Sequence, residues 1–334
     1  MLMKESLKII RRYIQHIMEV MGRGLKQIIQ ESPQYFHLMT KYTGWKLFKR
    51  RSPIFGSADI INVCNLHCDH CYWWTNRKES DELTLEQWKE VIDEKFKKQH
   101  VFAVTVIGGE PMMRPDVVKL FAKEFPKRAC VVTNGTFPLL KIKDLYFYWI
   151  SIDGDRETHN SIRGDDAWEM TRKNVKEYIE NNGEKAFKDI WISMTVNSRN
   201  YKTIRKVIEE WRDYSNKIGI QFHTPFMKDD PLWLPFGKER DEIVDEIIDM
   251  QKHEYKDYIS NPRKQLELMK KNWGGNGTTP IDCPTWTIVS VDHLGREKRP
   301  CCIGSAEKDS MKPRCEECGL GCYSIFVGSG IKGC

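Results

Sequence analysis

Short apolar runs alternate with longer amphipathic stretches over most of the chain after Pro53. The short runs have the length and β-branched content of buried strands, whereas the longer stretches repeat apolar residues every three or four positions, as one face of a helix does. Strands are predicted at 58–63, 103–107, 130–133, 148–153, 190–196 and 218–223, and helices around 83–98, 117–125, 166–181, 202–216 and 238–256. Six strand–helix units predict an α/β fold, a partial (β/α)6 barrel of the TIM type. Its functional residues should lie at the carboxyl ends of the parallel strands.

The residues before this barrel form a basic extension. Apolar residues from Met3 to Ile28 recur in steps of three and four, which predicts an amphipathic helix. A second basic cluster is interleaved with aromatic and aliphatic residues over 45–51. Such a pattern fits an anionic membrane surface. The alternative is a helix that docks on the outside of the barrel by the same apolar stripe.

Charge and length limit the possible partners and compartments. The net charge is +6, and residues 1–51 alone hold eleven Lys and Arg against three Glu, so the excess is confined to the extension and nucleic acid is not expected as a partner. No apolar run reaches the ~20 residues of a membrane span. The N-terminus also lacks a secretion signal. We therefore expect a cytoplasmic protein, peripheral on the inner face of the membrane through residues 1–51.

The 334 residues divide into three predicted regions. They are the basic helical extension over 1–53, the barrel over 54–256, and a helix with a small cysteine-rich extension over 257–334. Eleven cysteines in a cytoplasmic chain favour metal binding over disulfides. Cys130 stands apart in an apolar run and is expected to be a small core residue.

Cys64, Cys68 and Cys71 carry the most informative spacing in the chain. Three thiolates on one loop can hold three irons of a 4Fe–4S cluster, and the fourth iron is then open for chemistry. Zinc is the alternative, because His67 and His70 could complete a tetrahedral site.

This loop resembles the signature of the radical S-adenosylmethionine (SAM) enzymes. The resemblance implies that the open iron chelates SAM and that an electron, supplied by a reductant such as ferredoxin or flavodoxin, cleaves it to a 5′-deoxyadenosyl radical. It also assigns a SAM pocket at successive strand ends. The implied SAM-binding residues are Tyr72, Gly108, Gly109, Glu110, Pro111, Asn134, Ser151, Asp153, Arg163 and Val196.

Individual roles follow from this resemblance. Ser151 and Asp153 would face the ribose and Arg163 the methionyl carboxylate. Val196 would contact the adenine through its backbone, and Tyr72 would lie near the same ring. The structural alternative is that Asp153 caps the next helix and Arg163 forms a surface ion pair. His223, at the end of the sixth strand, is a candidate proton relay, although it is equally compatible with a satisfied core histidine.

Seven cysteines cluster near the C-terminus and resemble the twitch and SPASM extensions of radical SAM enzymes, which hold auxiliary iron–sulfur clusters. The implied ligands are Cys283, Cys301, Cys315 and Cys318, with Cys302, Cys322 and Cys334 as substitutes. A β-hairpin between Cys283 and Cys301 would bring the two together. A zinc site with four cysteine ligands is the alternative.

The order of motifs further resembles adenosylhopane synthase and its relatives, which implies a small-molecule or lipid substrate, namely an unactivated carbon of an isoprenoid or membrane lipid. One alternative is a peptide- or cofactor-maturing enzyme, although residues 1–51 are too short for the usual peptide-binding domain. An alternative of another class is a non-catalytic metal-binding or electron-transfer protein.

Overall fold

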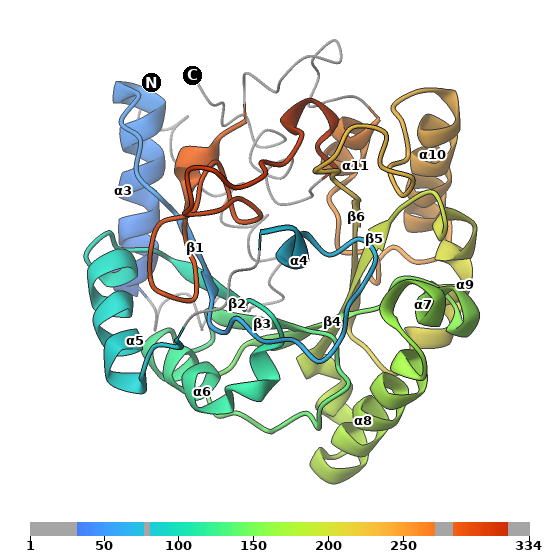
Figure 1. The fold of residues 1–334 in the computed structure, drawn as a ribbon, viewed down its shortest axis with the longest axis horizontal. Coiled ribbons are helices and arrows are strands. Elements are labelled where there is room, and N and C mark those ends of the chain that lie inside the picture. The colour runs from blue at the N-terminus through green and yellow to red at the C-terminus, as the bar shows by residue number, and fades with distance from the viewer. Residues whose placement is uncertain (1–31, 77–80, 271–282, 320–334) are drawn as a thin grey trace.

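A computed structural model describes residues 32–76, 81–270 and 283–319 of the chain. The helix predicted over 3–28 lies outside these residues, as do Cys322 and Cys334. The described part is a curved parallel sheet with helices α5, α6, α8 and α9 on its outer side (Figure 1).

The sheet has seven strands in the order β6-β5-β4-β3-β2-β1-β7, and every neighbouring pair is parallel. The strands are β1 Phe55–Asp59, β2 Ala103–Ile107, β3 Ala129–Thr133, β4 Phe147–Ser151, β5 Ile190–Val196, β6 Lys217–Phe222 and β7 Ile288–Val291. All six predicted strands are present. The first strand, predicted at 58–63, begins earlier and ends at Asp59. Ile60 and Ile61 are buried as expected of a strand, but they lie in the loop after β1.

The seventh strand changes the role of the C-terminal region. β7 was expected only as part of a local hairpin, but it pairs with β1, so that Ser57 lies beside Ser290. The hairpin-like turn is also present, because Lys298 N–H donates to Ser290 O at 2.8 Å and Asp292 N–H donates to Arg296 O at 2.9 Å. The extension therefore continues the barrel sheet.

The helices follow the predicted order, and α3, α4 and α7 are additional to the prediction. The α-helices are α3 Ser32–Phe48, α4 Tyr72–Asn76, α5 Leu85–Val91, α6 Pro115–Glu124, α7 Arg156–Arg163, α8 Ala167–Asn182, α9 Ile204–Trp211, α10 Lys238–His253 and α11 Arg263–Met269. Short helical segments are η1 Ile92–Lys97, η2 Pro111–Met113, η3 Glu184–Asp189, η4 Tyr201–Thr203, η5 Thr285–Thr287 and η6 Cys315–Glu317. Two of the additional helices, α4 and α7, lie within the barrel, and α7 begins where Asp155 accepts the backbone N–H of Thr158.

The main core lies between the sheet and its outer helices. Its largest fully buried side chains include Trp88, Phe96, Phe121 and Trp211. α6 contributes Val117, Val118, Phe121 and Ala122, which are three or four positions apart or adjacent on its buried face. This packing fixes the outer ring of helices and leaves the strand ends to build the site.

Helix α3 docks against the side of the barrel. Tyr35, Leu38, Tyr42 and Trp45 form its buried face. The Trp45 ring stacks on Trp286 at 6.2 Å, and Lys41 Nζ donates to the carbonyl oxygens of Pro53, Gln99 and His100. The predicted basic–aromatic cluster is therefore divided, because Trp45 is buried whereas Leu47 and Phe48 are 54% and 78% exposed.

Candidate active site

The three cysteines of the first loop border one large cavity at the carboxyl edge of the sheet. Cys64, Cys68 and Cys71 all line this cavity, whose volume is about 590 Å³. Other sequence-predicted residues on its wall are Tyr72, Gly108, Gly109, Glu110, Asn134, Ser151, Arg163, His223 and Cys302. Residues from the first loop, four strand ends and the C-terminal extension thus meet at one site.

The three thiols lie close enough to influence one another. Burial raises the pKa of Cys64 to about 11 and that of Cys71 to about 12, and the negative charge of Cys68 adds to both shifts. Bare thiols here would remain protonated at neutral pH, so a thiolate triad requires a cationic group between its members. The donor set therefore fits an iron–sulfur cluster.

A single metal ion finds less support. Within the described residues, no three His, Cys, Asp or Glu side chains converge as ligands of one ion. The zinc alternatives for the first loop and for the C-terminal cysteines thus gain no support from this part of the chain.

The turn after β2 is pressed against the chain that leads into the cysteine loop. Gly109 N–H donates to Ile61 O at 2.9 Å, and Glu110 N–H donates to Val63 O at 2.8 Å. A Cβ atom on Gly109 would lie 2.0 Å from Val63 O. Only glycine permits this approach, so the Gly-Gly-Glu-Pro turn sets the position of the backbone beside Cys64.

Glu110 ties this turn to the end of β3. Its buried carboxylate accepts from Met112 N at 2.9 Å, Thr133 Oγ1 at 2.6 Å and Asn134 N at 2.8 Å. Asn134 Nδ2 in turn donates to Asn65 Oδ1 at 3.0 Å, inside the cysteine loop. Pro111 lies behind this network as the first residue of η2 and is buried off the cavity wall. The network holds the turn, the strand end and the loop together.

Asp153 is placed differently from its predicted role. Its carboxylate is fully buried and does not line the cavity. One oxygen accepts from Arg163 Nε at 2.7 Å and lies 3.3 Å from His70 Nε2, while the other accepts from Thr195 N at 2.9 Å. With both oxygens engaged inside the protein, Asp153 orients Arg163 rather than facing a ribose.

Arg163 lies on the cavity wall beside the cysteine loop. Its guanidinium lines the cavity, and Nη1 lies 4.0 Å from Cys68 Sγ. Burial opposes its charge, but the Asp153 carboxylate outweighs this and raises the pKa of Arg163. The pair is buried, so the alternative of a surface ion pair is wrong.

Val196 also lies away from the cavity wall. Its side chain is fully buried, and its carbonyl accepts the N–H of His223 at 2.8 Å. Thr195 lines the cavity in its place, beside Gln221 on β6. The sequence could have predicted that Thr195 faces the cavity, because side chains alternate between the two faces of a strand and Ser193 and Thr195 therefore share a face.

His223 and His70 meet inside the cavity. Their rings are edge to face with centroids 6.2 Å apart, and His223 Nε2 lies 3.0 Å from Asp230 Oδ2. Burial lowers the pKa of His70 to about 4, so this ring is neutral at physiological pH. His223 therefore combines access to the cavity with a carboxylate partner.

The C-terminal cysteines gather against the end of β6. Burial, reinforced by neighbouring thiols, raises the pKa of Cys283, and those thiols are Cys318, Cys301, Cys315 and Cys302. Gly319 accepts the N–H of Phe222 at 2.8 Å, and its own N–H donates to Thr224 Oγ1 at 2.9 Å. The predicted ligands Cys301, Cys315 and Cys318 thus lie near enough to Cys283 to act on its pKa, while Cys302 lies on the wall of the main cavity.

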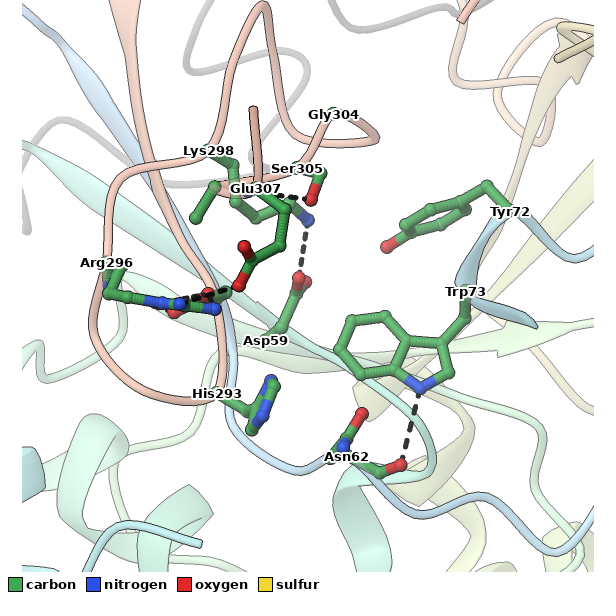
Figure 2. A pocket seen from close by; sticks show the side chains of 12 residues that line it. Asp59, Asn62, Tyr72, Trp73, His293, Arg296, Lys298, Gly304, Ser305 and Glu307 are labelled. Carbon is green, nitrogen blue, oxygen red and sulfur yellow. Dashed lines mark hydrogen bonds and ion pairs between the residues drawn. The ribbon is translucent and has the colours of Figure 1, made fainter. Parts of the chain in front are cut away.

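A buried ion pair joins this extension to the barrel. Lys298 Nζ binds the Asp59 carboxylate and the carbonyl of Cys302, and it lies 5.3 Å from the centroid of the Tyr72 ring. Figure 2 shows Lys298 directed at Asp59 on one side of a small pocket of about 50 Å³, with the Tyr72 ring facing this pair. Tyr72 directly follows Cys71, stacks on Phe226 and packs against the C-terminal extension. Its ring therefore connects the first cysteine loop with the extension that carries the C-terminal cysteines.

Comparison with known proteins identifies the family. Residues 59–209 match the radical SAM superfamily. The Fe-coproporphyrin III synthase of Methanosarcina barkeri is 33% identical over 280 residues, which cover 71% of this chain and 68% of that protein. The chain belongs to the radical SAM superfamily.

This chain matches a smaller share of the length of other relatives. The mycofactocin maturase of Mycobacterium tuberculosis (strain ATCC 25618 / H37Rv) is 25% identical over 58% of this chain, and this chain spans 50% of it. The subtilosin biosynthesis protein AlbA of Bacillus subtilis is 28% identical over 75% of this chain and is covered to 55%. The chain therefore spans about half the length of these relatives.

Solved structures share the fold. Streptococcus suis SuiB bound to the precursor peptide SuiA has a TM-score of 0.59 and 13% identity, covering 90% of this chain and 69% of that one. Native anSMEcpe with bound AdoMet has a TM-score of 0.51 and 17% identity, covering 81% and 80%. The prediction of an α/β radical SAM enzyme with an auxiliary C-terminal region is confirmed. Its cofactors are a 4Fe–4S cluster and SAM.

No helix in the described ranges is long and apolar enough to cross a membrane.

Proposed function

We propose that this radical SAM enzyme modifies a peptide, in a cavity bordered by both cysteine regions. The observation that carries the proposal is that Cys302 and Ile303 of the extension line the same cavity as Cys64, Cys68 and Cys71. A substrate between the two regions would be within reach of both. Relatives named as a mycofactocin maturase and as a protein of the biosynthesis of the bacteriocin subtilosin support this reading.

This proposal replaces the expected isoprenoid or membrane lipid. The relatives reported above carry names of peptide- and tetrapyrrole-related proteins, which agree better with the alternative of a peptide- or cofactor-maturing enzyme. The cavity itself offers space for a short peptide segment.

Each part of the chain has a defined task in the proposed reaction. Cys64, Cys68 and Cys71 would hold the cluster, and Arg163, fixed by Asp153, would bind the carboxylate of SAM. The cluster, when bound and reduced, supplies the electron that cleaves SAM to a carbon radical. Ser151 and Thr195 offer hydroxyls on the wall where the nucleoside would lie, and ferredoxin or flavodoxin is the proposed reductant.

His223 is the proposed proton acceptor. It lines the cavity and is held by Asp230. Burial raises the pKa of Asp230, but the hydrogen bonds from His223 and the Leu232 backbone, together with the nearby histidines, lower it overall. A carboxylate that stays ionised stabilises the imidazolium that forms when His223 takes a proton from the substrate.

A tetrapyrrole is the second candidate substrate. The specific observation in its favour is the 33% identity to Fe-coproporphyrin III synthase over 71% of this chain. A planar macrocycle and a peptide would leave different products, so one comparison separates them.

The test begins with anaerobically reconstituted protein and a strong reductant. We expect cleavage of SAM to 5′-deoxyadenosine, loss of cleavage in Cys64→Ala, and unchanged cleavage in Met170→Ala, an exposed position on α8. Peptide, porphyrin and lipid fractions of cells expressing the wild type or Cys64→Ala are then compared by mass spectrometry. A product in the peptide fraction supports the proposal. A product confined to the porphyrin or lipid fraction overturns it.

A further inference from the structure

The main cavity does not end at the SAM site but continues into the barrel. Its wall includes residues from the amino-terminal halves of the strands, among them Phe55, Ala103 and Trp191. The proposed cofactor positions use the carboxyl edge of the sheet. The inner part of the cavity is therefore unassigned.

The barrel interior is hollow because small residues line it. The strand register places Ser57 beside Thr105 and Thr105 beside Cys130, and all three line the cavity. On the other side Ser193 lies beside Gly219. Barrels of this type are usually filled by bulky branched side chains from alternate strands. Cys130, predicted to be a core residue, is instead part of this open wall.

One wall of the inner cavity is aromatic and rigid. Phe147 stacks on Trp191 at 4.3 Å with an interplanar angle of 13°, and Trp149 meets both rings edge to face at 5.2 Å. A Cβ atom on Gly219 would lie 2.8 Å from the Trp149 ring, so glycine makes room for this ring in the wall. Three interlocked rings present a flat surface suited to another ring.

The small-residue wall also carries an unsatisfied polar group. Ser57 is only 4% exposed, and among the described residues its hydroxyl has no hydrogen-bond partner. A buried hydroxyl normally bonds to protein, water or a bound molecule. Ser57 lines the cavity, so this buried hydroxyl lies directly behind the surface that an occupant of the barrel would meet.

We propose that the barrel interior is a binding pocket for an aromatic side chain of the substrate, which enters between Trp149 and the small-residue wall. This inference rests on the proposed function, because it names the peptide side chain that the enzyme holds. The ring would stack on or meet the three aromatic side chains, and the backbone of the substrate would remain near the cysteine loop. An aliphatic side chain of similar size would gain burial without the aromatic contacts.

The test uses N-acetyl-phenylalaninamide and N-acetyl-leucinamide as probes. Both are titrated by ligand-observed NMR into unreduced protein that has been reconstituted with iron and sulfide and saturated with SAM. We expect the aromatic amide to bind about two- to tenfold more tightly, as aromatic pairs contribute beyond burial. Equal binding of the two amides, or binding of neither, overturns the proposal.

Two sets of variants locate the binding. Ser193→Phe fills the interior and should weaken binding of the aromatic amide at least tenfold, whereas Ser193→Ala keeps the space and should retain it. Trp149→Leu should remove the preference for the aromatic amide over the aliphatic amide. If Ser193→Phe has a lowered melting temperature or iron content, its loss of binding is not interpreted and Trp149→Leu alone decides the outcome. Unchanged preference in Trp149→Leu overturns the proposal. The product of the wild type in the peptide, porphyrin or lipid fraction is determined separately, so failure of the proposed function is distinguishable from failure of this pocket.

Discussion

Buried polar side chains around Arg163 show how single residues build the site. Asp153 neutralises the guanidinium, His70 lies against the same carboxylate, and His159 Nδ1 accepts the N–H of Asp153 at 3.1 Å. Breaking a buried pair by removing one partner typically costs 3–5 kcal/mol, because the other charge remains buried. The protein itself therefore supplies the carboxylate that holds the Arg163 guanidinium in place, whether or not SAM is bound.

His159 makes this arrangement sensitive to acid. Burial, together with the charge of Arg163, lowers the pKa of His159 to about 3, whereas an unfolded histidine has its usual pKa near 6.5. The unfolded state therefore binds a proton that the folded state does not, and stability is lost as pH falls below 6.5. We expect wild type to lose about 2 kcal/mol more than His159→Asn between about pH 7.5 and pH 5.

Chemical denaturation of both proteins at the two pH values checks this expectation. Asn keeps a hydrogen-bond acceptor for Asp153 N–H but does not titrate. Parallel pH profiles for the two proteins would show that His159 does not cause the loss.

At the scale of elements, the turn after β2 and the cysteine loop behave as one unit. The turn bonds to the backbone of residues 61–63, and Glu110 and Asn134 connect both to the end of β3. The loop that carries the three cysteines therefore takes its conformation from a partner about forty residues further along the chain, in line with the principle that loops are positioned by a rigid scaffold.

Gly109→Ala tests this dependence. The added methyl group would overlap Val63 O, so the backbone beside Cys64 must move. We expect loss of most of the iron of the first cluster and of SAM cleavage. Gly44→Ala is the matched control, because its nearest neighbour is 3.9 Å away and it lies in helix α3. Full iron content in Gly109→Ala would contradict the proposed coupling.

The attachment of the extension depends on the Lys298–Asp59 pair. Lys298→Met leaves the Asp59 carboxylate buried without its cation, which should destabilise the protein by about 3–5 kcal/mol. The double variant Lys298→Met with Asp59→Leu removes both charges and should regain much of that loss. Urea denaturation of the single and double variants measures the difference. If the double variant is less stable than Lys298→Met by the further amount expected for an independent substitution, the two residues do not stabilise the protein as a pair.

For the whole molecule, two cysteine regions around one cavity predict two clusters. With four irons in each cluster, reconstituted protein should hold about eight irons per chain. The double variant Cys283→Ser with Cys315→Ser should hold about four and keep the first cluster. Iron and zinc analysis measures both. Four irons in wild type, unchanged in the double variant, would show that the C-terminal cysteines hold no iron.

The sequence by itself determined the barrel and the chemistry of its first loop. Strand and helix periodicities are local, so all six predicted strands are present, and 103–107 and 190–196 have the predicted bounds. Cys64, Cys68 and Cys71 lie within eight residues of one another, and such a spacing needs no tertiary contact to be recognised. Family membership followed from the same local motifs.

Only the tertiary structure decided which side chains face the cavity. Asp153 is turned away from the cavity because Arg163, His70 and Thr195 occupy its oxygens. The side chains of Ser193 and Thr195 face the cavity because strand pleating directs alternate residues to the same face. The pairing of β7 with β1 and the Lys298–Asp59 contact join residues more than two hundred positions apart. Such contacts depend on the packing of the whole sheet, which no local pattern of residues encodes.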